Sequence, residues 1–357
     1  MDHKTDISAM LELIAHPAFT VLDGNIVSVN QAAANLLIIP QTPVSDWLPS
    51  VPEELSTLSD GCLFLTLTIH GMRIGASVTR QNNAHLFILD APNSQPQLQA
   101  LSLAAKVLRA PLSGAMMAAE RLSSAENTPD AFKKDAAALN RHLHQLLRVI
   151  CNMSDAQRYT DSSADSLSLR NATALFREIF DKAGHLLEQA GIQLRYRELD
   201  EPIVCPLDEE KLERAIYNLL SNAIKASDKP GVLDAELRRK NSRLILSIRD
   251  HGEGFRRELL STAYSRYQRQ PGTEDPSFGI GLGLVMVRSA AAAHQGTVLI
   301  DHPADGGTRV TLSLQILPMQ DAAFRNNLIL FDYAGARDHG LVELSEHLPN
   351  HLYSKES

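Results

Sequence analysis

The stretch DEEKLERAIYNLLSNAIKAS, residues 208–227, contains the pattern on which the fold depends. Its apolar residues recur at intervals of three and four, which predicts an amphipathic helix with one buried face. Asn218 and Asn222 are four positions apart, so their side chains project from the same side of that helix. Two amide oxygens on one face can help to bind Mg²⁺ beside substrate phosphates. Lys225 follows on a neighbouring face, where it can meet phosphate. An Asn pair alone is more often a solvated surface.

Two later stretches carry glycines next to polar side chains. LILSIRDHGEGF, residues 244–255, predicts a strand that ends at Asp250 and is followed by Gly252 and Gly254. A carboxylate at a strand end can accept a hydrogen bond from an amino group such as that of adenine. GGTRVTLSL, residues 306–314, predicts a closing strand that begins just after Thr308.

A third stretch, SFGIGLGLVMVRSAAAAHQG at residues 277–296, leads from glycines directly into a helix. Gly279, Gly281 and Gly283 leave N–H groups of the helix N-terminus free to meet phosphate oxygens. The G-x-G-x-G spacing differs from the G-x-G-x-x-G of dinucleotide-binding folds, and the Gly-Lys-Ser/Thr ending of a P-loop is absent from it. The pattern therefore indicates phosphate binding of another type.

The order and spacing of these four stretches resemble the ATP-binding domain of sensor histidine kinases, a fold shared with gyrase and Hsp90-type ATPases. The resemblance implies an α/β sandwich, in which helices cover one side of a mixed sheet, with ATP and Mg²⁺ as cofactors. It implies that Asn218 and Asn222 bind the metal and that residues 263–278 form a mobile lid. The residues expected to bind the cofactor are Asn218, Asn222, Lys225, Asp250, Gly252, Gly254, Tyr264, Tyr267, Arg269, Gly279, Gly281, Gly283 and Thr308.

Residues 95–160 predict two helices whose apolar residues step by four and three without a miss. A short polar turn joins them, so we expect an antiparallel hairpin that suits a dimeric four-helix bundle. The stepping residues are Leu101, Ala105, Leu108, Leu112, Ala115, Ala119 and Leu122, then Phe132, Ala136, Leu139, Leu143, Leu146, Ile150 and Met153.

Within the first helix, AAKVLRAPLSG at residues 104–114 resembles the phosphoacceptor segment of the same family, Ser-His-Glu-Leu-Arg-Thr-Pro-Leu. Lys106 stands at the reactive histidine, Val107 at its acidic neighbour, and Ala110 at the position that supports phosphatase activity in many members. An exposed lysine is protonated near neutral pH and is then no nucleophile. We expect Lys106 to mark a degenerate catalytic position. His142 and His144 are poor substitutes, because antiparallel pairing puts them roughly 10 Å from the Lys106 layer.

Residues 1–94 predict a small α+β sheet unit, with hairpin turns at Asp23-Gly24 and His70-Gly71. The phrase DGNIVSVNQAAANLL, residues 23–37, resembles a PAS sensor domain, and no residue identifies a ligand. A structural or dimerising role is at least as plausible as ligand binding. Residues 161–317 form the expected ATP-binding unit. Residues 318–357 contain one strand-like run, at 327–335, and one helical run, at 341–348, without a motif.

The net charge of −8 argues against nucleic acid as the main partner. The three cysteines are far apart, which favours buried thiols in a reducing compartment. No run of about 18 apolar residues occurs, so we expect a cytoplasmic protein.

The chain is thus expected to be a multidomain α+β signalling protein, and three alternative functions remain open. It transfers phosphoryl groups to a histidine on a partner, for example in a heterodimer with an intact kinase. Alternatively, it is a non-catalytic, nucleotide-responsive module, a pseudokinase. In the third alternative, the chain phosphorylates a serine on a partner, and no residue of the sequence favours this function. The expected partners are a second copy through the hairpin and a response regulator.

Overall fold

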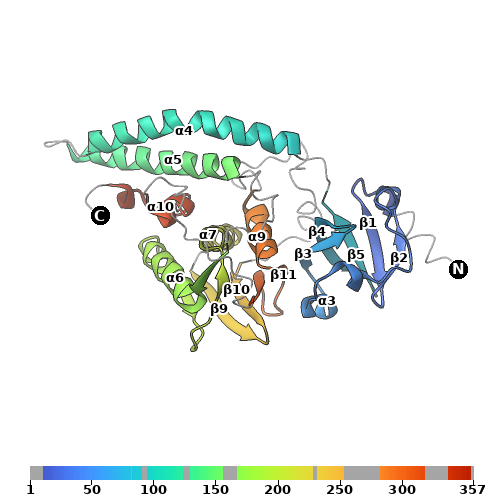
Figure 1. Ribbon diagram of the computed structural model, residues 1–357. Helices are drawn as coiled ribbons and strands as arrows, with labels where there is room; N and C mark the ends of the chain where they lie inside the picture. Colours follow the sequence, from blue (N-terminus) through green and yellow to red (C-terminus); the bar gives the residue numbers. More distant parts are fainter. Residues whose placement is uncertain are drawn as a thin grey trace.

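The computed structural model describes residues 11–81, 83–90, 95–123, 129–155, 167–227, 231–252, 282–317 and 337–354. An N-terminal sheet unit lies beside an α/β unit, and a long helical hairpin runs along the α/β unit (Figure 1). A short piece at the other end of the chain, residues 337–354, is called the C-terminal segment below. It lies between the hairpin and the α/β unit.

The N-terminal unit is an antiparallel sheet with strand order β2-β1-β5-β4-β3. Both expected hairpin turns are present, and Asp23-Gly24 and His70-Gly71 adopt the positive φ angles that tight two-residue turns require. Asn30 caps α2, since its side chain accepts a hydrogen bond from the Ala33 amide at 2.9 Å. The elements are β1 (Ala18–Leu22), β2 (Asn25–Val29), α2 (Gln31–Ala34), η1 (Val44–Trp47), α3 (Glu53–Thr57), β3 (Cys62–Ile69), β4 (Met72–Gln81) and β5 (Ala84–Leu89).

Aromatic side chains fill the middle of this unit. Phe19 stacks on Phe87 with ring centroids 5.0 Å apart, and Trp47 meets Phe19 edge-on at 5.8 Å. Both phenylalanines are fully buried. Large rigid rings of this kind supply much of the apolar area that a small sheet needs to bury.

Two long helices, α4 (Gln95–Ser123) and α5 (Asp130–Asp155), form the expected antiparallel hairpin. The hydroxyl of Ser102 donates to the Ser154 carbonyl at 3.0 Å, close to the register that the heptads predict. The stepping residues divide into two rows, each with a spacing of seven. The inner row is buried inside the hairpin: Ala105, Leu112 and Ala119 with Ala136, Leu143 and Ile150. The outer row is between 45% and 53% exposed at Leu108, Leu122, Phe132, Leu139 and Leu146.

The α/β unit has the sheet order β11-β12-β10-β9-β7, with β7 parallel to β9 and the other pairs antiparallel. Helices α6, α7 and α9 bury their apolar faces against it in one continuous core, which gives the predicted mixed α/β architecture. The elements are β6 (Ser168–Asn171), α6 (Ala172–Gln189), β7 (Gln193–Arg197), β8 (Val204–Leu207), α7 (Glu209–Ala226), β9 (Val232–Lys240), β10 (Arg243–Arg249), α9 (Leu282–Ala293), β11 (Thr297–Asp301) and β12 (Arg309–Gln315).

The two sheets join into one of ten strands, which the sequence did not predict. Strand β3 of the N-terminal unit pairs antiparallel with β11, and Phe64 lies opposite Val298. An ion pair supports the junction: Arg288 on α9 donates to Asp90 at 2.7 Å, with both side chains less than a tenth exposed. Gly75 lies against this pair, where a Cβ would come within 2.1 Å of the Asp90 carboxylate.

We expect Asp90→Ala to destabilise the chain by about 3–5 kcal/mol, because it leaves the Arg288 guanidinium buried without its carboxylate. Urea unfolding monitored through Trp47, the single tryptophan, measures the loss. The double variant Asp90→Ala/Arg288→Met removes both charges and should recover most of the stability. A single variant as stable as the wild type would contradict this role.

Candidate functional site

Helix α7 carries the asparagine pair. Asp208 caps its start by accepting from the Lys211 amide at 3.0 Å. The expected apolar face, Leu212, Ala215, Ile216, Leu219 and Leu220, is buried. A buried histidine ties the helix to the end of α9: the Asp208 amide donates to Nε2 of His294 at 3.0 Å. Burial lowers the pKa of His294, so the ring is neutral and its Nδ1–H donates to the Ala290 carbonyl.

This anchoring brings Asn218 to the start of α9. The Asn218 amide nitrogen donates to the Arg214 carbonyl at 2.8 Å and lies 3.7 Å from the Met286 sulfur. Its Oδ1 is 2.8 Å from the place where a Cβ on Gly283 would stand. Asn218 is 2% exposed, whereas Asn222, one turn later, is exposed. The predicted pair thus lies on one helix, but only its first member is buried against the glycine-started helix.

Asp250 lies at a second corner, where β10 ends. Its Oδ1 accepts from the amides of Gly252 and Thr308, both at 3.0 Å. A Cβ on Gly252 would come within 2.3 Å of the Ala226 carbonyl oxygen, and one on Gly307 within 2.0 Å of the Asp250 carbonyl oxygen. These glycines therefore let three loops meet around one buried carboxylate, itself 3% exposed.

Two polar groups at this corner lack partners among the described residues. Thr308 is 3% exposed, and its buried Oγ1 makes no hydrogen bond there. The second carboxylate oxygen of Asp250 also makes none of the described hydrogen bonds. Buried polar groups are normally paired, so an acceptor and a hydroxyl left over at one corner fit a polar ligand such as an aminopurine.

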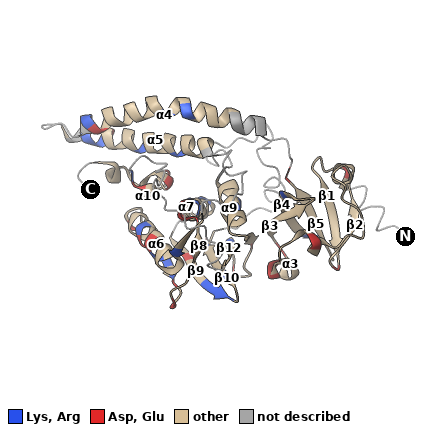
Figure 2. Ribbon diagram, viewed as in Figure 1, with Lys and Arg blue, Asp and Glu red and all other residues tan. Residues whose placement is uncertain are grey.

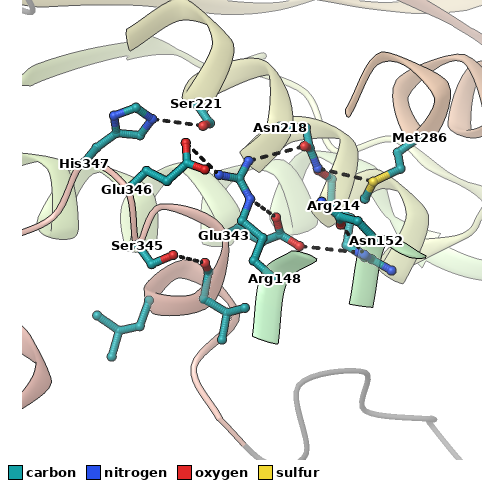
Figure 3. Close-up of polar contacts among 12 residues, drawn as sticks. Arg148, Asn152, Arg214, Asn218, Ser221, Met286, Glu343, Ser345, Glu346 and His347 are labelled. Carbon is teal, nitrogen blue, oxygen red and sulfur yellow. Dashed lines mark hydrogen bonds and ion pairs between the residues drawn. The ribbon is translucent and has the colours of Figure 1, made fainter. Parts of the chain in front are cut away.

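The C-terminal segment, with α10 (His339–Glu343) and η5 (Asn350–Tyr353), contacts α7 at several points along the helix. Lys225 does not face open space, because its ammonium contacts the Glu346 carboxylate directly. Ser221 lies 2.9 Å from the His347 ring. His339 lies 2.6 Å from Glu213. Figure 3 shows His347 pointing toward Ser221, with Glu346 and Glu343 of the same segment near Asn218.

Arg148 of the hairpin helix α5 completes the cluster. Its guanidinium donates to Glu343 at 3.1 Å and to Asn218 Oδ1 at 3.4 Å, and it lies 3.6 Å from Glu346 (Figure 3). The other oxygen of Glu343 lies 3.5 Å from Arg214, and both of those side chains are fully buried. Arg214 also donates to Asn152 at 3.0 Å. Three parts of the chain therefore meet in one buried ionic network.

The network fixes the charge states of two titratable side chains. Burial alone would raise the pKa of Glu346, but the hydrogen bond from Lys225 and the charge of Arg148 outweigh it and hold the pKa below its ordinary value. Burial lowers the pKa of His347 to about 4. Near neutral pH, Glu346 is therefore an anion and His347 is neutral.

Sequence reasoning missed Arg148, Arg214, Glu343, Glu346 and His347. A usable signal exists for Arg148, since it follows Asn140 and His144 at helical spacing on α5. Such a polar row suggests a solvated face, yet the C-terminal segment covers it: Asn140 donates to the Tyr353 carbonyl at 3.1 Å, and His144 packs edge-on against the Tyr353 ring. His144 is therefore engaged in packing.

Lys106 is exposed on α4, together with Val107 and Ala110. Leu112, four residues after Leu108, is buried in the hairpin. The remaining predicted site residues lie outside the described part of the chain: Gly254, Tyr264, Tyr267, Arg269, Gly279 and Gly281. The expected strand-like run at 327–335 lies outside it as well.

Comparison with known families matches residues 207–318 to the family described as "Histidine kinase-, DNA gyrase B-, and HSP90-like ATPase". The match spans α7, the Asp250 corner, α9 and β12. Among the helices that the structure describes, none is long and apolar enough to cross a membrane.

Several curated proteins are similar to the chain. It is 29% identical over 234 residues to the adaptive-response sensory kinase SasA of Gloeothece citriformis, which covers 61% of this chain and 57% of that protein. It is 30% identical over 122 residues to the sensor histidine kinase YvrG of Bacillus subtilis, covering 34% of this chain and 21% of that protein. It is 26% identical over 221 residues to the hybrid signal transduction histidine kinase D of Dictyostelium discoideum, covering 60% and 14%. The chain thus spans only part of the length of each.

Among solved structures, the crystal structure of full-length ShkA in complex with AMPPNP is 21% identical. The match covers 62% of this chain and 45% of that one, with a TM-score of 0.47.

Proposed function

We propose that this chain, a relative of the two-component sensor histidine kinases with an ATPase domain of their type, binds Mg²⁺·ATP and acts on a partner's histidine. The observation that carries the proposal is the buried corner at the end of β10, where Asp250 bonds to the Thr308 amide through one oxygen and the buried Thr308 hydroxyl has no partner among the described residues. This corner offers the chemistry of a base-binding pocket, and it stands in the domain that the ATPase family matches.

The residues fit the nucleotide at its base end. Asp250 can accept from the amino group of adenine through its second oxygen, and the Thr308 hydroxyl can complete the same polar edge. The position of Asn218 Oδ1 beside Gly283, near the start of α9, supports a role for Asn218 at the metal and phosphates. We assign Asn218 and Asn222 to Mg²⁺, with Lys225 and Gly283 at the phosphates. The nucleotide supplies the γ-phosphoryl group, and these residues position it and offset its charge.

The acceptor is proposed to lie on another chain. Lys106, Val107 and Ala110 occupy the reactive positions of the resembled phosphoacceptor segment, and none provides a histidine, an acid or a hydroxyl. The boundaries proposed for the units are 1–94 for a PAS-like unit, 95–160 for the hairpin and 161–317 for the ATP-binding unit. We place the protein in the cytoplasm, where ATP and response regulators are found.

A second function, a nucleotide-responsive pseudokinase, is favoured by one observation. Arg148 of the hairpin contacts Asn218 directly, so a change at the proposed metal site would be felt by the hairpin without any phosphoryl transfer. In that reading ATP acts as a ligand that repacks the two parts.

The exposed outer row of the hairpin supports a four-helix bundle made with a second copy or with an intact kinase. Leu108, Leu139 and Leu146 are about half exposed at heptad spacing, and an apolar row of this length normally has a partner. Figure 2 shows few charged residues along α4, which suits a bundle interface.

We expect Asp250→Ala to weaken ATP binding about tenfold to a hundredfold, since a charged hydrogen bond to the base contributes about 1.5–3 kcal/mol. Calorimetric titration of the purified chain with Mg²⁺·ATP measures the affinity. Asp234→Ala is the matched control, because it removes a nearby carboxylate that pairs with His251 at the surface. Equal affinity in the Asp250 variant and the wild type would refute the site assignment.

Incubation with γ-labelled ATP separates the functions. The chain alone is expected to gain no acid-labile, alkali-stable label, because its hairpin lacks the acceptor. Label on an added partner kinase whose own ATP site is inactivated would support transfer between chains. Nucleotide binding without transfer to any candidate kinase would favour the pseudokinase. Acid-labile label on the chain alone would contradict the loss of self-phosphorylation.

Leu139→Glu is expected to convert a dimer into a monomer, because it places a charge in the outer row. Light scattering after gel filtration gives the mass. Leu103→Glu is the control, since Leu103 is 66% exposed and lies off that row. A monomeric wild type, or an unchanged mass in Leu139→Glu, would remove the bundle proposal.

A further inference from the structure

The C-terminal segment lies at the phosphate end of the proposed nucleotide site. Glu346 contacts Lys225. Glu343 pairs with Arg148, whose guanidinium in turn reaches Asn218 Oδ1 (Figure 3). Both groups that we assign to phosphate and metal, Lys225 and Asn218, are therefore engaged by groups of the chain itself. The base end is different, because the described hydrogen bonds of Asp250 and Thr308 involve no residue of this segment.

We propose that Glu343 and Glu346 take the place of the nucleotide's phosphates, so that the C-terminal segment and Mg²⁺·ATP exclude one another. The inference deepens the proposed function and rests on it, since it concerns the regulation of the same site. The segment is then an internal competitor that closes the phosphate end and leaves the adenine end open.

Charge supports this substitution. Three cations, Arg148, Arg214 and Lys225, surround the two carboxylates. Arginine and lysine bind both carboxylates and phosphates through charge-assisted N–H donors that face anionic oxygens. If the glutamates withdraw, the cations need other anions, because unpaired buried charges are strongly unfavourable. A triphosphate can supply them.

The metal position gives an independent argument. An Mg²⁺ ion needs a free amide oxygen from Asn218, but that oxygen accepts from the Arg148 guanidinium at 3.4 Å. A divalent cation and a guanidinium repel each other at such a distance. Arg148 must therefore move before the metal binds, and its pairing with buried Glu343 holds it in place.

The same segment also docks on the hairpin. Side chains of α5 donate to its backbone carbonyls, with Gln145 bonded to Ser345 at 3.2 Å and Arg141 to Leu348 at 3.4 Å. Opening of the segment would thus clear the phosphate site and remove the part of the attachment to α5 that runs through the segment, leaving the direct contacts of Arg148 with Asn218 and of Asn152 with Arg214. A single equilibrium between the closed and the open segment would then affect both nucleotide binding and the contact with the hairpin.

The test uses the full chain and variants that preserve side-chain shape. Glu346→Gln removes the anion that contacts Lys225, and we expect it to tighten Mg²⁺·ATP binding about tenfold by raising the fraction of open molecules. Adenosine, which has no phosphates, should bind with unchanged affinity. Glu178→Gln is the matched control, because it removes an exposed partner of Lys182 on α6, away from the cluster.

A second measurement needs no variant. Saturating Mg²⁺·ATP should accelerate hydrogen exchange at residues 339–348 of the wild-type chain, and adenosine should not. Unchanged ATP affinity in Glu346→Gln together with unchanged exchange would overturn the inference, as would an equal gain for adenosine. Failure of every variant and the wild type to bind both ATP and adenosine would overturn the proposed function itself.

Discussion

Glu343 has no exposed surface and lies between two arginines. The arrangement of the chain depends on this contact. Arg148 comes from the hairpin, Arg214 from the ATPase-type domain, and Glu343 from the far end of the chain. Buried charges are tolerated only when they are paired and hydrogen-bonded. Glu343 therefore holds the other two elements together, because its removal leaves the buried guanidinium groups of Arg148 and Arg214 without their shared carboxylate. A buried network of this kind contributes specificity of arrangement more than net stability.

The domain is fastened on its opposite side by another buried pair. Arg288, on the helix that begins at the glycine-rich stretch, meets Asp90 at the end of the N-terminal sheet. The pairing of β3 with β11 makes the sheet continuous across that junction. The helix that starts at Gly283 is thus linked to the N-terminal unit, and the helix that carries Asn218 is linked to the hairpin. A displacement of the N-terminal unit would reach the proposed nucleotide site through α9, and a displacement of the hairpin would reach it through α7.

The features that the sequence predicted are those that depend on residues close together along the chain. Asp23-Gly24 specified a turn through positive φ angles, and the buried face of residues 208–227 followed from helical spacing. The heptads predicted the hairpin. They did not distinguish the buried inner row from the exposed outer row, because spacing alone does not say what each row contacts. Arg148 and Glu343 are 195 positions apart, and no periodic pattern connects them. From the sequence alone, both side chains would be predicted to lie on a solvated surface, and only the folded structure shows that they contact each other.

The proposed loss of the acceptor at Lys106 agrees with this geometry. A hairpin that receives phosphate from its own ATP-binding domain needs that domain free to swing toward the reactive side chain. Here Arg148 and Asn152 of α5 contact Asn218 and Arg214 of the domain directly. At the proposed acceptor position, Lys106 carries an amine instead of an imidazole. The inner-row leucines Leu112 and Leu143 are buried and pack the two helices against each other. If the hairpin acts through this contact, as the proposed pseudokinase function requires, it needs its apolar rows and Arg148, and it needs no histidine at position 106.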